Sequence, residues 1–377
     1  MATAKPTTSN DGYQTLSEKS QQEIPAPRLP YRPKDPELYN PPIGLIGCGG
    51  ITVQHLRAYQ AAGYRVVALC DIFEENARKR QEEFYPQAAV YTDHHEMLRR
   101  DDIEVVDITT HPAVRPPLIE DALRAGKHVL SQKPFVLDLD VGEHLVEVAK
   151  QNNERLAVNQ NARWAPHFSY AREAYRNGYL GNLHGVHLSV RWDHRWVEGT
   201  PFASIKHLVL YDYAIHWFDF VNYLLHDEQP QRVFATTTRT RTQTLMPAMS
   251  ASVSATYPNT QITIAFDAAT PYGRQDSTYL AGSEGSLFST GPNEKVQVVT
   301  LYTAEGISTP ELVGSWFPDG FHGAMAELLC SVEEGREATH NAEGNLKSLA
   351  MCFAAIHSAE TGEIAVPGQI RKLYGTA

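Results

Sequence analysis

Several features that mark particular classes of protein are scarce or missing in this 377-residue chain. No apolar run approaches the roughly 20 residues that a membrane span needs. Basic residues are outnumbered, with 33 Lys and Arg against 44 Asp and Glu, which gives a net charge of −11. This balance argues against nucleic acid as a partner, because phosphate binding needs a basic face. The first residues show neither a secretory leader pattern nor a twin arginine, so we expect a cytoplasmic protein.

Cysteine is also scarce, and its spacing matches no metal or redox motif. The four cysteines are Cys48, Cys70, Cys330 and Cys352. Their apolar or helical surroundings favour buried free thiols over disulfides or a metal site. No His-Glu-x-x-His motif occurs. His184, His187 and His194 cluster along one expected strand, where packed or exposed side chains are more typical than metal ligands, so we expect no metal.

The first 41 residues lack the apolar content of a folded core. Residues 1–24 are polar, and the segment that follows is rich in proline, so the composition favours an extended arm. Two interpretations stay open, a disordered tail and an arm that lies across a neighbouring subunit. The apolar side chains that would support such an arm are Leu29, Tyr31, Leu38 and Tyr39.

The most informative feature is a glycine-rich turn that follows an apolar segment. It contains Gly47, Gly49 and Gly50, with Thr52 where Gly or Ala normally allows close helix packing. Small residues let the backbone approach a pyrophosphate at a helix N-terminus. Asp71 ends the next apolar run and can accept hydrogen bonds from a ribose diol. The pattern predicts a dinucleotide site, with a purely structural strand–helix–strand unit as the alternative.

Asp71 also bears on the choice of cofactor. A carboxylate at this position would repel a ribose 2′-phosphate, so NAD is favoured over NADP. Ile72 follows it and offers no cation. Arg78, Lys79 and Arg80 lie further along and could reach back, although a solvated helix face is the simpler interpretation. NADP stays the less favoured alternative.

From residue 42 to 162, strand-like and helix-like segments alternate. Such alternation predicts a Rossmann domain, a parallel sheet with helices on both faces and ligands bound outside the carboxyl ends of its strands. We expect strands near 43–47, 65–71, 88–91, 104–109, 127–131 and 156–160. We expect helices at 51–62, 73–84, 94–100, 115–125 and 139–152.

From residue 163 to 377 the pattern changes to runs rich in Thr, Val and aromatic residues. These runs predict an α+β domain with a large, mostly antiparallel, open-faced sheet, through which a homodimer or homotetramer could form. We expect strands at 185–192, 232–240, 248–257, 261–268, 278–280 and 296–301. We expect helices at 168–178, 209–226, 321–335 and 343–358. Residues 1–41 would then be a proline-rich arm before the two domains.

Three segments carry side chains suited to chemistry. Lys133 stands just past an expected buried strand, where the plain alternative is a surface lysine. Asn161 and Arg163 follow the last parallel strand. Asp212 and His216 are four residues apart, so both project from one helix face, as ordinary surface pairs also do. A carboxylate and an imidazole together can orient a carbinol and take its proton.

The combination resembles the Gfo/Idh/MocA oxidoreductase family over about residues 42–365. The hallmarks of that family are the glycine turn, an Ala-Gly-Lys-His-Val strand leading to Glu-Lys-Pro, and a helix carrying Asp-x-x-x-His. The resemblance implies that Lys133 contacts the reacting hydroxyl. It implies that Asp212 and His216 complete the catalytic set, with the histidine as proton acceptor.

The resemblance also implies which residues line the ligand sites. The expected cofactor-binding residues are Gly47, Gly49, Gly50, Ile51, Asp71, Ile72, Thr109, Thr110, His111, Pro112, Arg115, Gln132, Lys133, Asn161 and Arg163. The expected substrate-binding residues are Lys133, Arg163, Trp164, Trp192, His194, Asp212 and His216. Aromatic and cationic side chains suit hydroxyl-rich rings, and they suit ordinary strand packing as well.

Three positions depart from the family pattern. Gln132 replaces the usual glutamate before the lysine, and Arg115 stands where many members have a histidine. The segment His207-Leu208-Val209-Leu210 replaces a glycine cluster that often precedes Asp-x-x-x-His. These changes bear on the substrate more than on the chemistry.

The resemblance implies an NAD-dependent oxidoreductase that oxidises a secondary alcohol or hemiacetal of a sugar, anhydrosugar or cyclitol. Two alternatives stay open. One is a glycoside-cleaving enzyme whose tightly held NAD is recycled within each turnover. The other is a non-catalytic dinucleotide-binding sensor, against which the complete set of Lys133, Asp212 and His216 argues.

Overall fold

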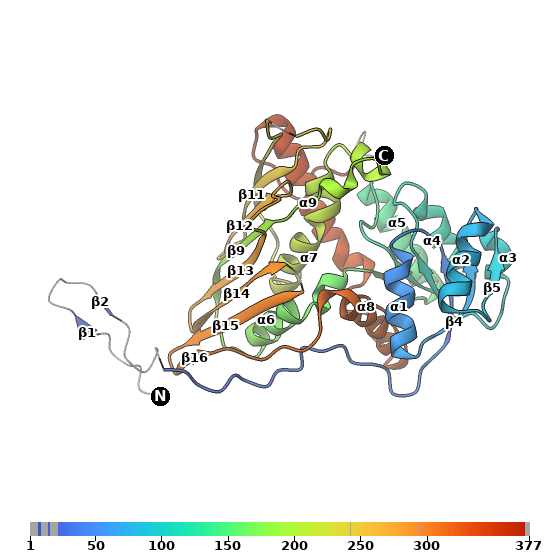
Figure 1. The fold of residues 1–377 in the computed structure, drawn as a ribbon, viewed down its shortest axis with the longest axis horizontal. Helices are drawn as coiled ribbons and strands as arrows, with labels where there is room; N and C mark the ends of the chain where they lie inside the picture. Colours follow the sequence, from blue (N-terminus) through green and yellow to red (C-terminus); the bar gives the residue numbers. More distant parts are fainter. Residues whose placement is uncertain (1–6, 9–13, 16–21, 242, 294, 374–377) are drawn as a thin grey trace.

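Two sheets of very different kind, with helices packed between them, make up this chain (Figure 1). The structure is a computed structural model that describes residues 7–8, 14–15, 22–241, 243–293 and 295–373. A two-stranded pair, β1 (Thr7–Thr8) and β2 (Gln14–Thr15), precedes the main body.

The first large sheet is parallel and six-stranded, in the order β5-β4-β3-β6-β7-β8. Its strands are β3 (Pro42–Ile46), β4 (Arg65–Cys70), β5 (Ala89–Tyr91), β6 (Val105–Ile108), β7 (His128–Ser131) and β8 (Leu156–Val158). The helices between them are α1 (Thr52–Ala62), α2 (Glu74–Phe84), α3 (His94–Leu98), α4 (Arg115–Arg124) and α5 (Leu139–Asn152). Strand order reverses beside β3, so the predicted Rossmann fold is confirmed, and its carboxyl edge is where a ligand is expected.

The second sheet has eight strands in the order β10-β11-β12-β9-β13-β14-β15-β16. Its strands are β9 (Leu183–Arg191), β10 (Arg232–Thr238), β11 (Ser250–Thr256), β12 (Gln261–Asp267), β13 (Gln275–Gly282), β14 (Gly285–Asn293), β15 (Val296–Thr303) and β16 (Gly306–Ser308). Among the described strands of this sheet, only β12 and β9 pair in parallel, so the mostly antiparallel sheet is confirmed. Buried and exposed residues alternate along β10, β11 and β12, which leaves one face of the sheet toward solvent.

Helices of the second half cover the other face of this sheet and reach the Rossmann unit (Figure 1). They are α6 (Pro166–Arg176), α7 (Ile215–Leu224), α8 (Trp316–Glu333) and α9 (Ala342–Thr361). The short helical segments are η2 (Asn161–Trp164), η3 (Arg195–Val197), η4 (Pro201–Ser204) and η5 (Val209–Tyr213), of which η5 is a π-helical turn. Helix α8 joins the core of the Rossmann unit, where Phe321 and Met325 share one apolar cluster with Leu56 and Tyr59 of α1. The division of the chain at residue 162 stays a prediction. None of the described helices is long and apolar enough to span a membrane.

The described part of the arm, residues 22–41, lies against its own chain, which neither interpretation from the sequence foresaw. It begins beside β16, where Ile24 N–H donates to Ile307 O at 2.8 Å. It then follows α8 toward β3, and Glu333 accepts the backbone N–H groups of Glu37 and Leu38 (Figure 1). Leu29, Tyr31 and Tyr39 pack on the two apolar cores, whereas Leu38 is almost fully exposed.

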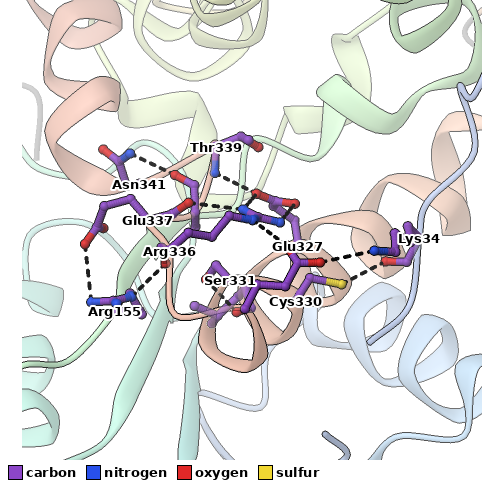
Figure 2. A network of polar contacts seen from close by, with 12 residues as sticks. Lys34, Arg155, Glu327, Cys330, Ser331, Arg336, Glu337, Thr339 and Asn341 are labelled. Carbon is purple, nitrogen blue, oxygen red and sulfur yellow. Dashed lines mark hydrogen bonds and ion pairs between the residues drawn. The ribbon is translucent and has the colours of Figure 1, made fainter. Parts of the chain in front are cut away.

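A polar network joins the arm, the Rossmann unit and the connection between α8 and α9 (Figure 2). Arg336 pairs with both oxygens of Glu327, at 2.6 and 3.1 Å. Arg155 donates to the carbonyl of Arg336 at 2.9 Å, and Lys34 of the arm pairs with Glu334 at 3.1 Å. The connection after α8 is therefore fixed against the start of β8.

Candidate active site

The glycine turn after β3 forms an open backbone cradle. Gly47 has φ +94°, and a Cβ there would lie 2.9 Å from the Thr110 side chain, so only glycine fits. Gly49 and Gly50 are exposed, and a Cβ at either would meet nothing within 4 Å. No side chain caps the N-terminus of α1, whose N-cap is Ile51. The positive end of the α1 helix dipole and the open backbone before it suit an anion such as a pyrophosphate.

Thr52 fits the turn because its hydroxyl closes it. The Thr52 hydroxyl donates to Gly47 O at 2.8 Å and lies 3.0 Å from the Thr109 hydroxyl, which also contacts Gly47 O at 2.5 Å. The loop after β6 is thereby tied to the turn after β3. Thr109 and Thr110 thus border the cradle, whereas a cofactor contact for these two residues, His111 and Pro112 stays a prediction.

Asp71 directly follows β4 and faces the same turn. Its carboxylate accepts the backbone N–H of Cys48 at 2.7 Å and that of Phe73 at 2.9 Å. Ile72, next in the chain, is 79% exposed. Of the three cations considered for an NADP phosphate, Arg80 does reach the turn, donating to Gly49 O at 3.1 Å, and Glu83 balances its charge at 3.0 Å.

Lys133 and Asp212, which are far apart in the sequence, are in contact. Lys133 follows β7, and its Nζ donates to the backbone oxygen of Asp212 at 2.9 Å and to its carboxylate at 3.1 Å. Asp212 belongs to the π-helical turn η5 and His216 to the first turn of α7. The parallel sheet and the helices of the second half therefore each contribute to one polar centre.

His216 is the neutral partner in this centre. Burial lowers the pKa of its imidazole well below the ordinary value, and the positive charge of Lys133 lowers it further. Its Nδ1 is buried without a hydrogen-bond partner among the described residues. A neutral imidazole with a free nitrogen can accept a proton.

Aromatic rings line one side of the centre. The ring of His194 lies 4.1 Å from that of Tyr213 and 5.2 Å from that of Trp192. Burial lowers the pKa of His194 to about 4, against the opposing effect of Asp212. Trp316 lies 5.3 Å from the ring of His216. His194 is thus within electrostatic range of Asp212, and Trp192 packs at 6.3 Å from the ring of Trp316, which flanks His216.

Arg115 and Gln132 are buried behind Lys133. The guanidinium of Arg115 donates to the carbonyl of Thr110 at 3.0 Å and to that of Pro134 at 2.5 Å, and it also contacts the carbonyl of Gln132. Burial lowers the pKa of Arg115 to about 10. These contacts hold the loops after β6 and β7 together. Arg115 therefore supports the backbone on both sides of Lys133, and its expected contact with the cofactor stays a prediction.

Asn161, Arg163 and Trp164 point into the protein. Asn161 accepts the indole N–H of Trp316 at 2.7 Å. Arg163 pairs with both oxygens of Asp219, at 2.5 and 2.7 Å, and its guanidinium lies 4.0 Å from the ring of Tyr223. The Trp164 ring lies 5.1 Å from that of His340. The structure therefore does not bring Arg163 or Trp164 to Lys133, because their polar or ring contacts lie in the interior.

Two buried residues that the sequence analysis passed over lie next to the centre. His55, on α1, contacts Gln132, and Trp316 flanks His216. A signal for His55 existed, since His55, Tyr59 and Leu56 share the buried face of α1. Trp316 begins a helix whose start the sequence placed five residues later, so no pattern marked it.

Among the described residues, one group of side chains has metal-binding spacing, and it contains none of the histidines His184, His187 and His194. Asp93, His94 and His95 bring three ligand atoms within 4.8 Å of one another. His187 instead contacts the Thr263 hydroxyl at 2.7 Å. The four cysteines are buried and free, as predicted.

Comparison with known proteins identifies the family. A model described as the oxidoreductase family with an NAD-binding Rossmann fold matches residues 42–160, and the GFO/IDH/MocA C-terminal domain matches residues 168–288. The D-apiose dehydrogenase of Paraburkholderia graminis is 31% identical over 48% of this chain and about half of its own length, 49%. The inositol 2-dehydrogenase of Rhizobium meliloti is 27% identical over 86% of this chain and 98% of its own.

Solved structures share the fold. An oxidoreductase from Agrobacterium radiobacter, in complex with NAD+, L-tartaric acid and magnesium, aligns with a TM-score of 0.78 at 19% identity, over 87% of this chain and 99% of its own. The predictions of an NAD-binding Rossmann domain and of an oxidoreductase are confirmed by the family models. The chain belongs to the Gfo/Idh/MocA family of oxidoreductases.

Proposed function

We propose that this oxidoreductase removes a hydride from a hydroxyl-bearing carbon of a neutral sugar, anhydrosugar or cyclitol and transfers it to NAD. One observation carries the proposal. An ammonium, Lys133, a carboxylate, Asp212, and a neutral imidazole, His216, gather from two parts of the chain at the carboxyl end of the parallel sheet. These are the groups that oxidation of an alcohol requires.

The residues around the glycine turn fit NAD. The open backbone at Gly49 and Gly50 and the uncapped start of α1 would receive the pyrophosphate. Asp71, fixed by two backbone N–H groups, would accept from the adenosine ribose. Thr109 and His111 border the same edge of the sheet. When bound, NAD supplies the hydride acceptor.

Each residue of the polar centre has a separate task. His216, neutral because it is buried, takes the proton of the substrate hydroxyl. Lys133 donates a hydrogen bond to the oxygen on which negative charge develops. Asp212 holds the Lys133 ammonium in place and accepts from a hydroxyl of the substrate. General acid–base help of this kind contributes about 10²–10⁴ in rate.

The substrate class rests on relatives and on the aromatic wall. Two relatives are named for D-apiose and inositol, both small and rich in hydroxyl groups. Trp192 and His194 offer ring faces beside the centre, and hydroxyl-rich rings pack on such faces. The charged group that contacts Lys133 is Asp212, so the ammonium is already balanced before a substrate binds.

A screen for NADH tests the proposal. The purified chain is incubated with pentoses, hexoses, anhydrosugars, inositols and sugar acids, with NAD and NADP in parallel, and absorbance is followed. NADH formation with a neutral polyol supports the proposal. Turnover of a glycoside without net NADH would replace it with the self-recycling mechanism. Tight NAD binding with no turnover of any compound would point to a sensor.

We also propose that the eight-stranded sheet forms the subunit interface. Its solvent face carries the partly exposed aromatic side chains of Phe234, Tyr279 and Tyr302. Aromatic side chains spread over β10, β13 and β15 on an uncovered sheet suit a contact with a second copy of the chain. Light scattering should give a dimer or tetramer, and Tyr279→Lys should shift the chain toward monomer. A wild-type chain that is monomeric at micromolar concentration would contradict this.

A further inference from the structure

A buried polar network ends at the backbone N–H of Lys133. His55 of α1 places its Nδ1 2.7 Å from the carboxylate of Asp107, on β6, and its Nε2 3.1 Å from Nε2 of Gln132. The Lys133 N–H donates to Oε1 of Gln132 at 2.7 Å. Asn159, after β8, completes the network with Nδ2 3.2 Å from Nε2 of His55. All four side chains are at most 5% exposed.

One backbone donor, the Lys133 N–H, determines the orientation of the Gln132 amide and the tautomer of His55. The Lys133 N–H can only donate, so the Gln132 atom beside it is the oxygen. The Gln132 atom beside His55 is then the amide nitrogen, which can only donate, so Nε2 of His55 accepts. Asn159 donates to the same nitrogen. The imidazole proton therefore sits on Nδ1 and is donated to Asp107.

One charged side chain among the described residues contacts His55. Asp107 is the charged group in contact with it, and Tyr59 donates its hydroxyl to the same carboxylate oxygen at 2.7 Å. From α8, the ring of Phe321 lies 4.8 Å from the imidazole. Arg115, on α4, is within electrostatic range of Asp107. A second proton on His55 would leave two donors facing the amide nitrogen of Gln132, which cannot accept.

We infer that His55, held in one neutral tautomer, is a positioning residue that fixes Lys133 through Gln132. Gln132 in place of the usual glutamate keeps this network in one protonation state. A carboxylate at position 132 would present an acceptor to the acceptor Nε2, so residues 55 and 132 could form a hydrogen bond only while the pair holds one added proton, which is less available as pH rises. The inference rests on the proposed function, because it takes Lys133 to act on the substrate hydroxyl.

The first test needs no substrate. His55→Phe keeps a ring against Phe321 and removes both nitrogens, so the Gln132 side chain that accepts from Lys133 loses its contact with residue 55 and keeps the longer one with Asn159, at 3.4 Å. We expect acetylation of Lys133 by acetic anhydride, measured by peptide mass spectrometry against exposed Lys150, to rise about threefold or more because local opening becomes easier. His167→Phe, which removes a buried imidazole on α6, should leave this ratio unchanged.

The second test uses kinetics on the substrate that the NADH screen finds. His55→Phe should lower kcat about 10- to 100-fold, as displacement of a reacting group does, with the KM for NAD unchanged. Gln132→Glu should retain activity at low pH and lose it as pH rises, whereas the wild-type profile lacks this loss. The Gln132→Glu profile also tests the inference should His55→Phe fail to fold.

The outcomes separate this inference from the proposed function. Wild-type labelling and wild-type kcat in His55→Phe, or a Gln132→Glu profile that superimposes on the wild type, would overturn the inference. Raised labelling of Lys133 in a protein that turns over no polyol would keep the positioning role and overturn the proposed function instead.

Discussion

Replacing Arg163 with methionine distinguishes a structural from a ligand-binding role for this residue. Arg163 is 5% exposed, and its guanidinium forms two parallel hydrogen bonds with Asp219, which is 1% exposed. Arg163→Met would leave the Asp219 carboxylate with one hydrogen-bond partner among the described residues, the Ser348 hydroxyl at 3.2 Å. Removal of one partner from a buried ion pair costs about 3–5 kcal/mol.

The expected effect on melting temperature is large. At roughly 2–4 °C per kcal/mol for a domain of this size, the loss corresponds to a fall of about 6–20 °C in Tm. Arg124→Met, at an exposed pair with Glu120, is the matched control and should change stability by at most about 1 kcal/mol. Arg163→Met/Asp219→Leu should recover much of the loss, because the unpaired charge is gone. Thermal unfolding by circular dichroism measures all three.

Calorimetry on the same variants tests whether Arg163 binds NAD. We expect folded Arg163→Met, titrated well below its Tm, to bind NAD with wild-type affinity, since Arg163 contacts Asp219 and Thr339. A Tm within about 1 °C of wild type together with a tenfold weaker NAD affinity would refute the reasoning and return Arg163 to the cofactor site.

Three further changes have defined outcomes. Lys133→Ala should lower kcat by about 10²-fold or more while calorimetry shows an unchanged Kd for NAD, because Lys133 contacts Asp212 and not the glycine turn. Equal losses in kcat and in NAD affinity would contradict the role of Lys133. Gly47→Ala should weaken NAD binding and lower Tm, since a Cβ at φ +94° would lie 2.9 Å from Thr110; unchanged binding would contradict the cradle. Burial lowers the pKa of His167 and His340 to about 3, so on acidification these histidines take up protons in the unfolded chain before they do so in the folded one. The free energy of unfolding should therefore fall as pH falls below about 6.5, by about 2 kcal/mol for each histidine between pH 7.5 and 5. A Tm independent of pH in that range would refute this.

Local patterns were enough to predict the Rossmann half. Every expected strand and helix between 42 and 162 is present within a few residues, because the parallel strands are mostly apolar and helices carry local signals, such as Gly63 at the end of α1. The second half was less regular. β14 was missed because Gly291 and Pro292 interrupt it and its burial does not alternate, and β16 has only three residues.

The site shows the limit of a one-dimensional pattern. Residue types along the chain marked Lys133, Asp212 and His216, yet the same reasoning assigned Arg163 and Trp164 to ligands. The direction of those side chains depends on partners such as Asp219, 56 residues away, which no local spacing reveals. His55 was passed over for the same reason, because its partner Asp107 lies 52 residues further along.

A crystal structure of the chain with NAD bound would test the central claim most directly. We expect the pyrophosphate over Gly49 and Gly50 and the nicotinamide C4 atom facing the Lys133–Asp212 pair and the ring of His216. A nicotinamide that lies away from these three side chains, or a pyrophosphate bound elsewhere, would contradict it.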